Sequence, residues 1–228
     1  MLESDDLKQF PYDYKRSYPY CDLAFLRLRC NEVLNSYEDL LSDKYSVRNI
    51  CFQPFSKTDC EQDPEIFKIR IFNNDLSLLA LEKKFYIDNT LTKETAFLSK
   101  TQVLKIINGD VRWLCYEDSL LLQEFYYKIN VFGLAPKTVI DYTRETFSLP
   151  DYNIRITLDY NIKSAICKKN MFSPLFLTFP TPLNPVVMKI KWFDYLPCKI
   201  RNALVFNFGS NPDYDPAFSE LAFCRAYN

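Results

Sequence analysis

Asn153-Ile154-Arg155-Ile156-Thr157-Leu158-Asp159 alternates between polar and apolar residues from end to end. Successive side chains of a β-strand point to opposite faces, so Ile154, Ile156 and Leu158 would share one face of an extended strand. The polar residues, Arg155 and Asp159 among them, would share the other. The stretch therefore predicts a strand with one apolar face and one charged face.

Two further stretches repeat this pattern. In Phe67-Lys68-Ile69-Arg70-Ile71 the two basic residues lie opposite the three apolar ones. In Met188-Lys189-Ile190-Lys191-Trp192 the two lysines do the same. Each stretch predicts a strand that carries two positive charges on a single face.

Two other strands are less regular. In the strand from Leu79, Leu81 and Phe85 oppose Glu82 and Lys84, but Lys83 interrupts the apolar face. On the strand around Arg144 both faces are mixed. The polar faces of all five strands hold seven basic residues and two carboxylates: Lys68, Arg70, Lys84, Arg144, Arg155, Lys189 and Lys191, with Glu82 and Asp159.

Alternation alone leaves two arrangements open. In a β-sandwich the apolar faces meet and the charged faces lie in water. In a closed barrel the charged faces can instead line the interior, with helices covering the apolar outside. A barrel interior with this excess of positive charge would attract polyphosphate.

The composition predicts one globular, strand-rich domain. The chain has 228 residues, of which 48% are hydrophobic and 25% charged, with 16 Tyr and 19 Phe against 3 Gly. Large aromatic side chains are typical of strands. The net charge of −1 gives no indication of a nucleic-acid partner. The absence of histidine excludes Ser/His/Asp triads and histidine-based zinc sites.

The cysteines and the start of the chain indicate a cytoplasmic location. None of the eight cysteines forms a C-x-x-C pair, and the first residues, Met-Leu-Glu-Ser-Asp-Asp, do not resemble a secretion signal. We therefore expect reduced thiols. The longest apolar run, around residues 76–81, is far shorter than the roughly 20 residues of a transmembrane helix.

Periodicity and turn residues predict the remaining elements. Apolar residues recur at helical spacing in three segments, and Gly109 and Gly133 are expected to end the second and third of them. Residues 45–64 are expected to form a short strand and a loop. The predicted helices are 22–41, 90–109 and 118–131, and the predicted strands are 65–72, 78–87, 138–147, 153–162, 175–179, 186–193 and 201–208.

The charged strands, taken in order, resemble the VTC domain, the polyphosphate polymerase domain of the CYTH or triphosphate tunnel superfamily. The resemblance spans about residues 12–226 and implies an α+β fold, an antiparallel β-barrel tunnel with flanking helices, in one domain over residues 1–228. It is carried by Phe67–Ile71, Leu81–Lys84, Tyr142–Phe147, Asn153–Asp159 and Val187–Lys191.

This resemblance implies a protein that binds ATP or another triphosphate in a basic tunnel and transfers the γ-phosphate to a growing polyphosphate chain. Mn²⁺ or Mg²⁺, held by a carboxylate, would assist the transfer. Carried over by position, the catalytic residues would be Lys68, Arg70, Lys84, Arg144 and Arg155, the further phosphate-binding residues Lys189 and Lys191, and the metal ligands Glu82 and Asp159.

Three positions depart from the family pattern. The N-terminal R-x-E-x-K-Y motif reads Lys15-Arg16-Ser17-Tyr18-Pro19-Tyr20, and the E-x-K strand that supplies a metal carboxylate reads Lys189-Ile190-Lys191. The lysine of a C-terminal S-K-Y motif is replaced within residues 219–223. The alternative function is therefore a catalytically inactive module that binds polyphosphate or an inositol phosphate, and a purely structural sandwich also stays open.

Overall fold

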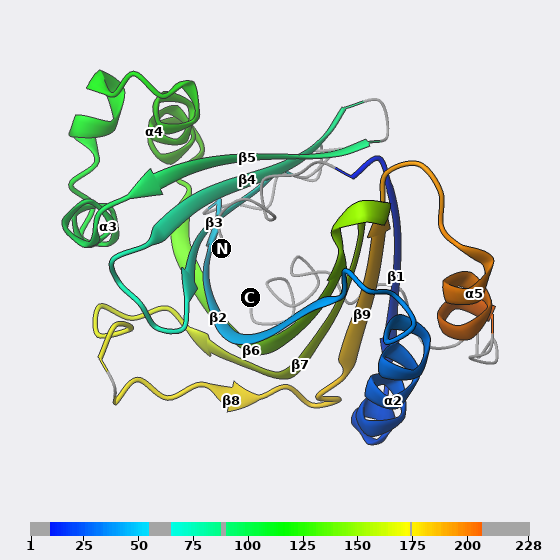
Figure 1. Ribbon diagram of the computed structural model, residues 1–228. Coiled ribbons are helices and arrows are strands. Elements are labelled where there is room, and N and C mark those ends of the chain that lie inside the picture. Colours follow the sequence, from blue (N-terminus) through cyan, green and yellow to red (C-terminus); the bar gives the residue numbers. More distant parts are fainter. Residues whose placement is uncertain (1–9, 55–64, 88–89, 174, 207–228) are drawn as a thin grey trace.

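The computed structural model describes residues 10–54, 65–87, 90–173 and 175–206 (Figure 1). Its strands form a single antiparallel sheet in the order β1-β9-β7-β6-β2-β3-β4-β5, and β8 pairs with β7. The strands are β1 (Tyr12–Tyr18), β2 (Leu41–Gln53), β3 (Ile66–Phe72), β4 (Leu79–Ile87), β5 (Thr90–Leu98), β6 (Ala135–Leu149), β7 (Ile154–Ile166), β8 (Phe179–Pro180) and β9 (Val186–Trp192).

The sheet curls strongly, so that β4 and β5 lie across its concave side from β6, β7 and β9 (Figure 1). No ladder joins β5 to β1 within the described ranges. The curled sheet thus resembles a tunnel, but in the described residues its two edge strands, β1 and β5, are not joined by hydrogen bonds. The predicted α+β class, with an antiparallel sheet and flanking helices, is confirmed.

Helices lie on the convex side of the sheet (Figure 1). They are α2 (Leu23–Leu34), α3 (Lys100–Ile107), α4 (Leu120–Phe132) and α5 (Cys198–Arg201), with short helical turns at Tyr20–Asp22, Arg112–Tyr116, Pro150–Tyr152 and Asn202–Phe206. None of the helices in the described part of the chain is long and apolar enough to cross a lipid bilayer.

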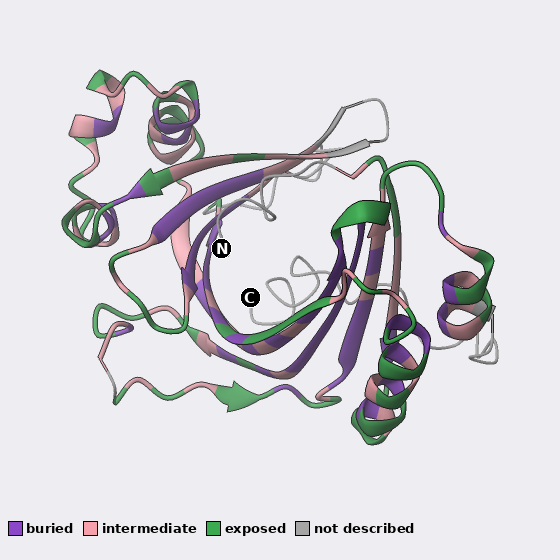
Figure 2. Ribbon diagram, viewed as in Figure 1, coloured by how far each residue is buried: buried purple, intermediate pink, exposed green. Residues whose placement is uncertain are grey.

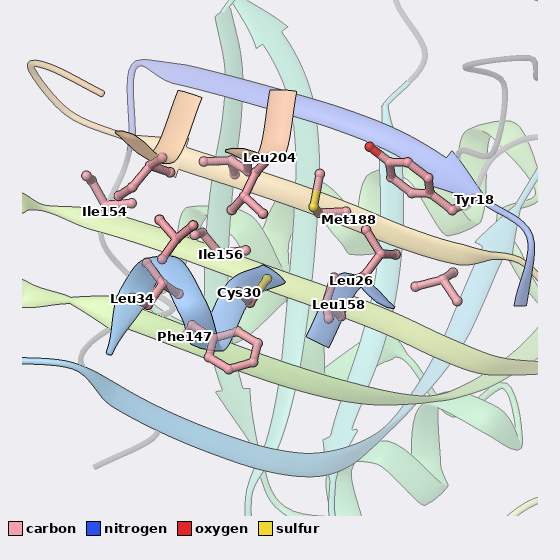
Figure 3. Packing of buried hydrophobic residues seen from close by; sticks show 14 of the residues in the cluster. Tyr18, Leu26, Cys30, Leu34, Phe147, Ile154, Ile156, Leu158, Met188 and Leu204 are labelled. Atoms are coloured by element: carbon pink, nitrogen blue, oxygen red, sulfur yellow. The ribbon is translucent and has the colours of Figure 1, made fainter. Parts of the chain in front are cut away.

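Helix α2 covers the apolar faces of β6, β7 and β9. Leu26 and Leu34 pack against Ile156 and Leu158 of β7 and Ile190 of β9, and all five side chains are fully buried. Figure 3 shows this layer between the helix and the strands. Burial of each such side chain stabilises the fold by about 1.5–3 kcal/mol.

Helices α3 and α4 cover β2, β3 and β4 in the same way. Phe125 of α4 stacks on Phe67 at 5.4 Å between ring centroids and meets Phe52 edge-on at 5.0 Å. Lys83, which interrupts the apolar pattern of β4, lies on this side and donates to Glu124 at 2.6 Å. Its ammonium group also lies 3.2 Å from Glu65. The interruption is therefore an ion pair between the sheet and α4.

Two predicted helices are partly strand. The segment 22–41 is helical only to Leu34, and the long strand β2 then covers 41–53, where a short strand and loop were expected. Residues 55–64 lie outside the described residues. The segment 90–109 divides into β5 and α3 at Ser99, whose side chain accepts from Gln102 N while Gln102 accepts from Ser99 N. The S-x-x-Q pattern of Ser99 and Gln102 is a capping-box sequence, which indicates that the helix begins there and not at residue 90.

The chain after β9 was also predicted incorrectly. Residues 198–206 form α5 and a helical turn instead of a strand over 201–208, of which 207 and 208 lie outside the described residues. Only the end of the predicted strand 175–179 pairs, as β8, and β1 was not predicted. The other five predicted strands are confirmed, and helix α4 ends as expected at Gly133, with φ of 64°.

Replacing Leu34 with Ala is expected to destabilise the protein by about 2–5 kcal/mol, because a cavity would remain between α2 and the sheet. Denaturant unfolding measures the change. Leu28→Ala on the same helix is the matched control, since Leu28 is 54% exposed and its loss should have little effect. Equal effects of the two substitutions would contradict the packing described here.

Candidate functional site

All nine residues predicted from sequence to form the site lie on the concave side of the sheet. Directly opposed residues of antiparallel strands share a face. Lys68 opposes Glu82, Arg144 opposes Asp159, and Arg155 opposes Lys191. The apolar neighbours of these residues pack on the convex side under the helices. Charged faces exposed to bulk water, as in a sandwich, are therefore excluded.

These charged side chains are largely shielded from solvent. Lys68 is fully buried, and Arg70, Arg144 and Arg155 are between 4% and 9% exposed. Figure 2 shows the buried stretches running along the strands that form the concave side. Buried charges are strongly unfavourable unless they are paired, so the partners of these groups determine whether the arrangement is stable.

The first group, called here the Glu82 cluster, comprises Lys68, Arg70, Glu82, Lys84 and Lys93 on β3, β4 and β5. Arg70 Nη1 donates to Glu82 Oε1 at 2.9 Å, and Arg70 Nε donates to Asn49 at 3.1 Å. Lys68 Nζ lies 3.6 Å from Glu82 Oε2. Burial raises the pKa of Glu82, but the positive charges of Arg70, Lys68 and Lys93 outweigh burial and lower it.

The second group, the Asp159 cluster, comprises Arg144, Arg155, Asp159, Lys189 and Lys191 on β6, β7 and β9. Arg144 binds Asp159 through two parallel hydrogen bonds of 2.6 and 2.8 Å. Lys189 Nζ donates to Asp159 Oδ2 at 2.9 Å. Burial again opposes ionisation, yet Arg144 and Lys189 together hold the pKa of Asp159 well below its usual range.

An apolar patch on the same face adjoins both clusters. It comprises Tyr45, Val47, Cys51, Ile140, Tyr142, Ile162 and Val187, with Phe72 packed against it. The guanidinium of Arg70 lies 5.9 Å from the ring centre of Phe72, and that of Arg144 lies 5.3 Å from that of Tyr142. Arg155 Nη2 donates to Tyr45 Oη at 3.5 Å. Aromatic rings thus help to orient three arginines.

The two clusters act on each other electrostatically across the curve of the sheet. Burial lowers the pKa of Lys191; the negative charge of Asp13 opposes this shift, and the charges of Lys189, Lys93 and Arg144 add to it. Lys93 belongs to β5 at one end of the strand order, and Lys191 belongs to β9 near the other. Charged groups from both ends of the strand order therefore act on the same lysine.

Sequence reasoning missed two basic residues of this face. Lys15 of β1 opposes Lys189, and Lys93 of β5 opposes Lys84. Lys93 was missed because its segment was interpreted as helix, and Lys15 because β1 was not predicted. Within the described ranges, the register assigns nine cations and four carboxylates to this face: Lys15, Lys68, Arg70, Lys84, Lys93, Arg144, Arg155, Lys189 and Lys191, with Asp13, Asp43, Glu82 and Asp159.

The two predicted metal ligands do not fit a divalent ion. Glu82 and Asp159 lie on β4 and β7, which are not neighbours in the sheet, and each is paired with lysine and arginine. A metal site needs several oxygen ligands that are not already neutralised. No group of three or more His, Cys, Asp or Glu that could hold a metal occurs among the residues the structure describes.

Comparison with known proteins identifies a family. The family model described as the VTC domain matches residues 55–201. No curated protein matches the chain in sequence.

Three solved structures align with most of this chain at low sequence identity. A Bacillus halodurans protein provisionally described as an adenylate cyclase shares 12% identity, with 82% of each chain covered and a TM-score of 0.49. The Pyrococcus horikoshii protein PH1012 shares 9%, covering 82% of this chain and 81% of that one, with a TM-score of 0.42. PH1819 from the same organism shares 14%, with 84% of each chain covered and a TM-score of 0.39.

Asp159→Asn is expected to destabilise the protein by about 3–5 kcal/mol, because Arg144 and Lys189 lose their counter-charge in a buried position. The pKa of Asp159 is lower in the folded protein than in the unfolded chain. Its contribution to stability is therefore present above the unfolded pKa and is lost as pH falls.

Unfolding free energies measured from neutral pH into the acid range test this expectation. The native protein should lose stability more steeply with falling pH than Asp159→Asn. Asp110→Asn, at an exposed position, is the control and should behave like the native protein. Parallel curves for the native protein and Asp159→Asn would contradict the assignment.

Proposed function

Because the chain belongs to the VTC domain family, we propose that its concave face binds the phosphate chain of a nucleoside triphosphate or of polyphosphate. The observation that carries the proposal is the excess of nine cations over four carboxylates on this one face. The cations come from seven strands, β1, β3, β4, β5, β6, β7 and β9. Such a distribution suits an extended polyanion better than a single anion.

The chemistry of the side chains supports a phosphate ligand. Guanidinium groups match pairs of non-bridging phosphate oxygens, and ammonium groups act as point charges that adapt to several geometries. Glu82 and Asp159 hold Arg70 and Arg144 in fixed positions before any ligand arrives. We assign these two carboxylates the role of positioning residues, because a fixed donor loses less freedom on binding.

Phosphoryl transfer is the active form of this proposal. The Glu82 and Asp159 clusters provide two sets of cations, one for the γ-phosphate of ATP and one for the end of a phosphate chain. A terminal oxygen of that chain would attack the γ-phosphorus and form a new P–O bond. The bond from the γ-phosphorus to the bridging oxygen would break, and ADP would leave with the electron pair. Lys68, Arg70, Lys84, Arg144 and Arg155 would stabilise the charge on the transferred group.

Binding without transfer is the second candidate, in which the face holds polyphosphate or an inositol phosphate. A specific observation favours it: Lys189, at the position of a metal carboxylate in the resembled family, donates to Asp159 at 2.9 Å. Incubation of the purified protein with ATP and Mn²⁺ or Mg²⁺, followed by gel analysis of polyphosphate, separates the two. Polymer formation would establish transfer; binding of polyphosphate without polymer would establish the binding module.

Arg155→Met and Lys191→Met are each expected to weaken tripolyphosphate binding about tenfold or more, since a hydrogen bond to a charged group contributes about 1.5–3 kcal/mol. Titration calorimetry measures the affinity. Lys163→Met is the matched control, because Lys163 is exposed and adjoins Ser164 of the concave face without sharing that face. Any polymer formed from ATP should decrease with the same two substitutions. Unchanged binding in both variants would overturn the proposal.

Affinity for tripolyphosphate should decrease as pH rises into the alkaline range, because Lys191 would lose its positive charge at a lower pH than an ordinary lysine. Lys191 has a lowered pKa in the free protein, and a bound anion would raise it. Deprotonation of Lys191 thus competes with binding. Calorimetry over this pH range measures the effect, and Lys191→Met should show a flatter dependence. Affinity that rises with pH would contradict this role of Lys191.

A further inference from the structure

The carboxylate of Asp159 is fully occupied by protein cations. Its Oδ1 accepts from Arg144 Nε at 2.6 Å, and its Oδ2 accepts from Arg144 Nη2 at 2.8 Å and Lys189 Nζ at 2.9 Å. Asp159 itself is only 4% exposed. A divalent ion at this carboxylate would have to displace the ammonium group or break the paired hydrogen bonds of the guanidinium.

Glu82 is also surrounded by cations, although its Oε2 accepts no hydrogen bond from the residues that the structure describes. Arg70 Nη1 lies 2.9 Å and Lys93 Nζ 3.8 Å from its Oε1. Its Oε2 lies 3.6 Å from the ammonium group of Lys68, a residue with no solvent exposure. A metal ion bound at Oε2 would therefore meet the full charge of a buried lysine, with little water to screen the repulsion.

Among the described residues, neither the positions directly opposite Lys189 nor its neighbours on the same face of β9 hold a second carboxylate, and Asp13 on β1 opposes Lys191 instead. Lys189 is opposed by Lys15 on β1 and by Thr157 on β7. On its own strand, the next residues on the same face are Val187 and Lys191. Mg²⁺ and Mn²⁺ prefer carboxylate and other oxygen ligands, and this arrangement supplies one hydroxyl and otherwise cations or an apolar group.

A metal carried in by the ligand would also be disfavoured. A magnesium complex of a phosphate chain adds two positive charges to a face on which Lys189, Lys93 and Arg144 already disfavour the charged form of Lys191. The metal would further occupy non-bridging oxygens that the guanidinium and ammonium groups could otherwise contact. Like charges brought together at an interface are strongly unfavourable.

We propose that this face, if it binds phosphate chains as proposed above, takes the chain free of divalent metal, with Lys189 supplying at Asp159 the positive charge that a metal ion would otherwise supply. The ligand class is a linear phosphate chain with its full negative charge. The inference thus rests on the proposed function and adds a preference for the metal-free ligand.

Titration calorimetry with sodium tripolyphosphate tests the inference under two conditions, with EDTA and with Mg²⁺ in excess over the ligand. We expect binding in EDTA that is tighter by about tenfold or more, equivalent to about 1.4 kcal/mol, than binding in Mg²⁺. Equal or tighter binding with Mg²⁺ would overturn the inference and leave the proposed function intact. No binding under either condition would instead refute the proposed function.

A second measurement needs no phosphate ligand. Mn²⁺ alone should leave the melting temperature of the native protein unchanged, and stabilisation by Mn²⁺ would overturn the inference. Lys189→Glu would place two carboxylates side by side, and we expect this variant to be stabilised by Mn²⁺. Lys163→Glu introduces the same charge at an exposed position of β7 and is the control, for which no such stabilisation is expected.

Discussion

The need to balance buried positive charge on the concave side of the sheet is the constraint on which the rest of the structure depends. Isolated charges are excluded from a protein interior by their loss of hydration. Here Arg144 and Arg70 are retained because Asp159 and Glu82 accept hydrogen bonds from them at 2.6 and 2.9 Å. Each carboxylate serves more than one cation, so the face keeps a positive excess while its deepest groups remain paired.

The convex side explains why the charges face inward. The apolar faces of β6, β7 and β9 require a cover, which α2 provides, and those of β2, β3 and β4 require another, which α3 and α4 provide. Once helices occupy the outside, strand alternation directs every second residue to the concave side. The curvature of the sheet then brings residues from β5 and β9 into one electrostatic environment.

Regular alternation was the part of the sequence that predicted structure well. The stretch from Asn153 to Asp159 identified a strand, its two faces and two site residues, because each residue there agrees with the pattern. In β2 only a short strand was predicted, because polar residues such as Arg48 and Asn49 obscured the length of a strand that is defined by pairing with β3 and β6. Lys93 could not be assigned to the site, since β5 depends on pairing with β4 for its identity. Long-range pairing such as that of β2 with β6 leaves no local signal in a single sequence, whereas β5 pairs with the strand just before it and its pattern was interpreted as helix.

If the face binds phosphate chains as proposed, the apolar patch around Tyr45 and Tyr142 would let it discriminate between ligands of different length. The patch offers few partners for a phosphate group, so favourable contacts are concentrated in the two flanking clusters. A single phosphate can reach one cluster, whereas a chain that reaches both gains the second contact within the same molecule, where the effective concentration is high. The affinity of a linear anion would then depend on whether it is long enough to contact both clusters at once.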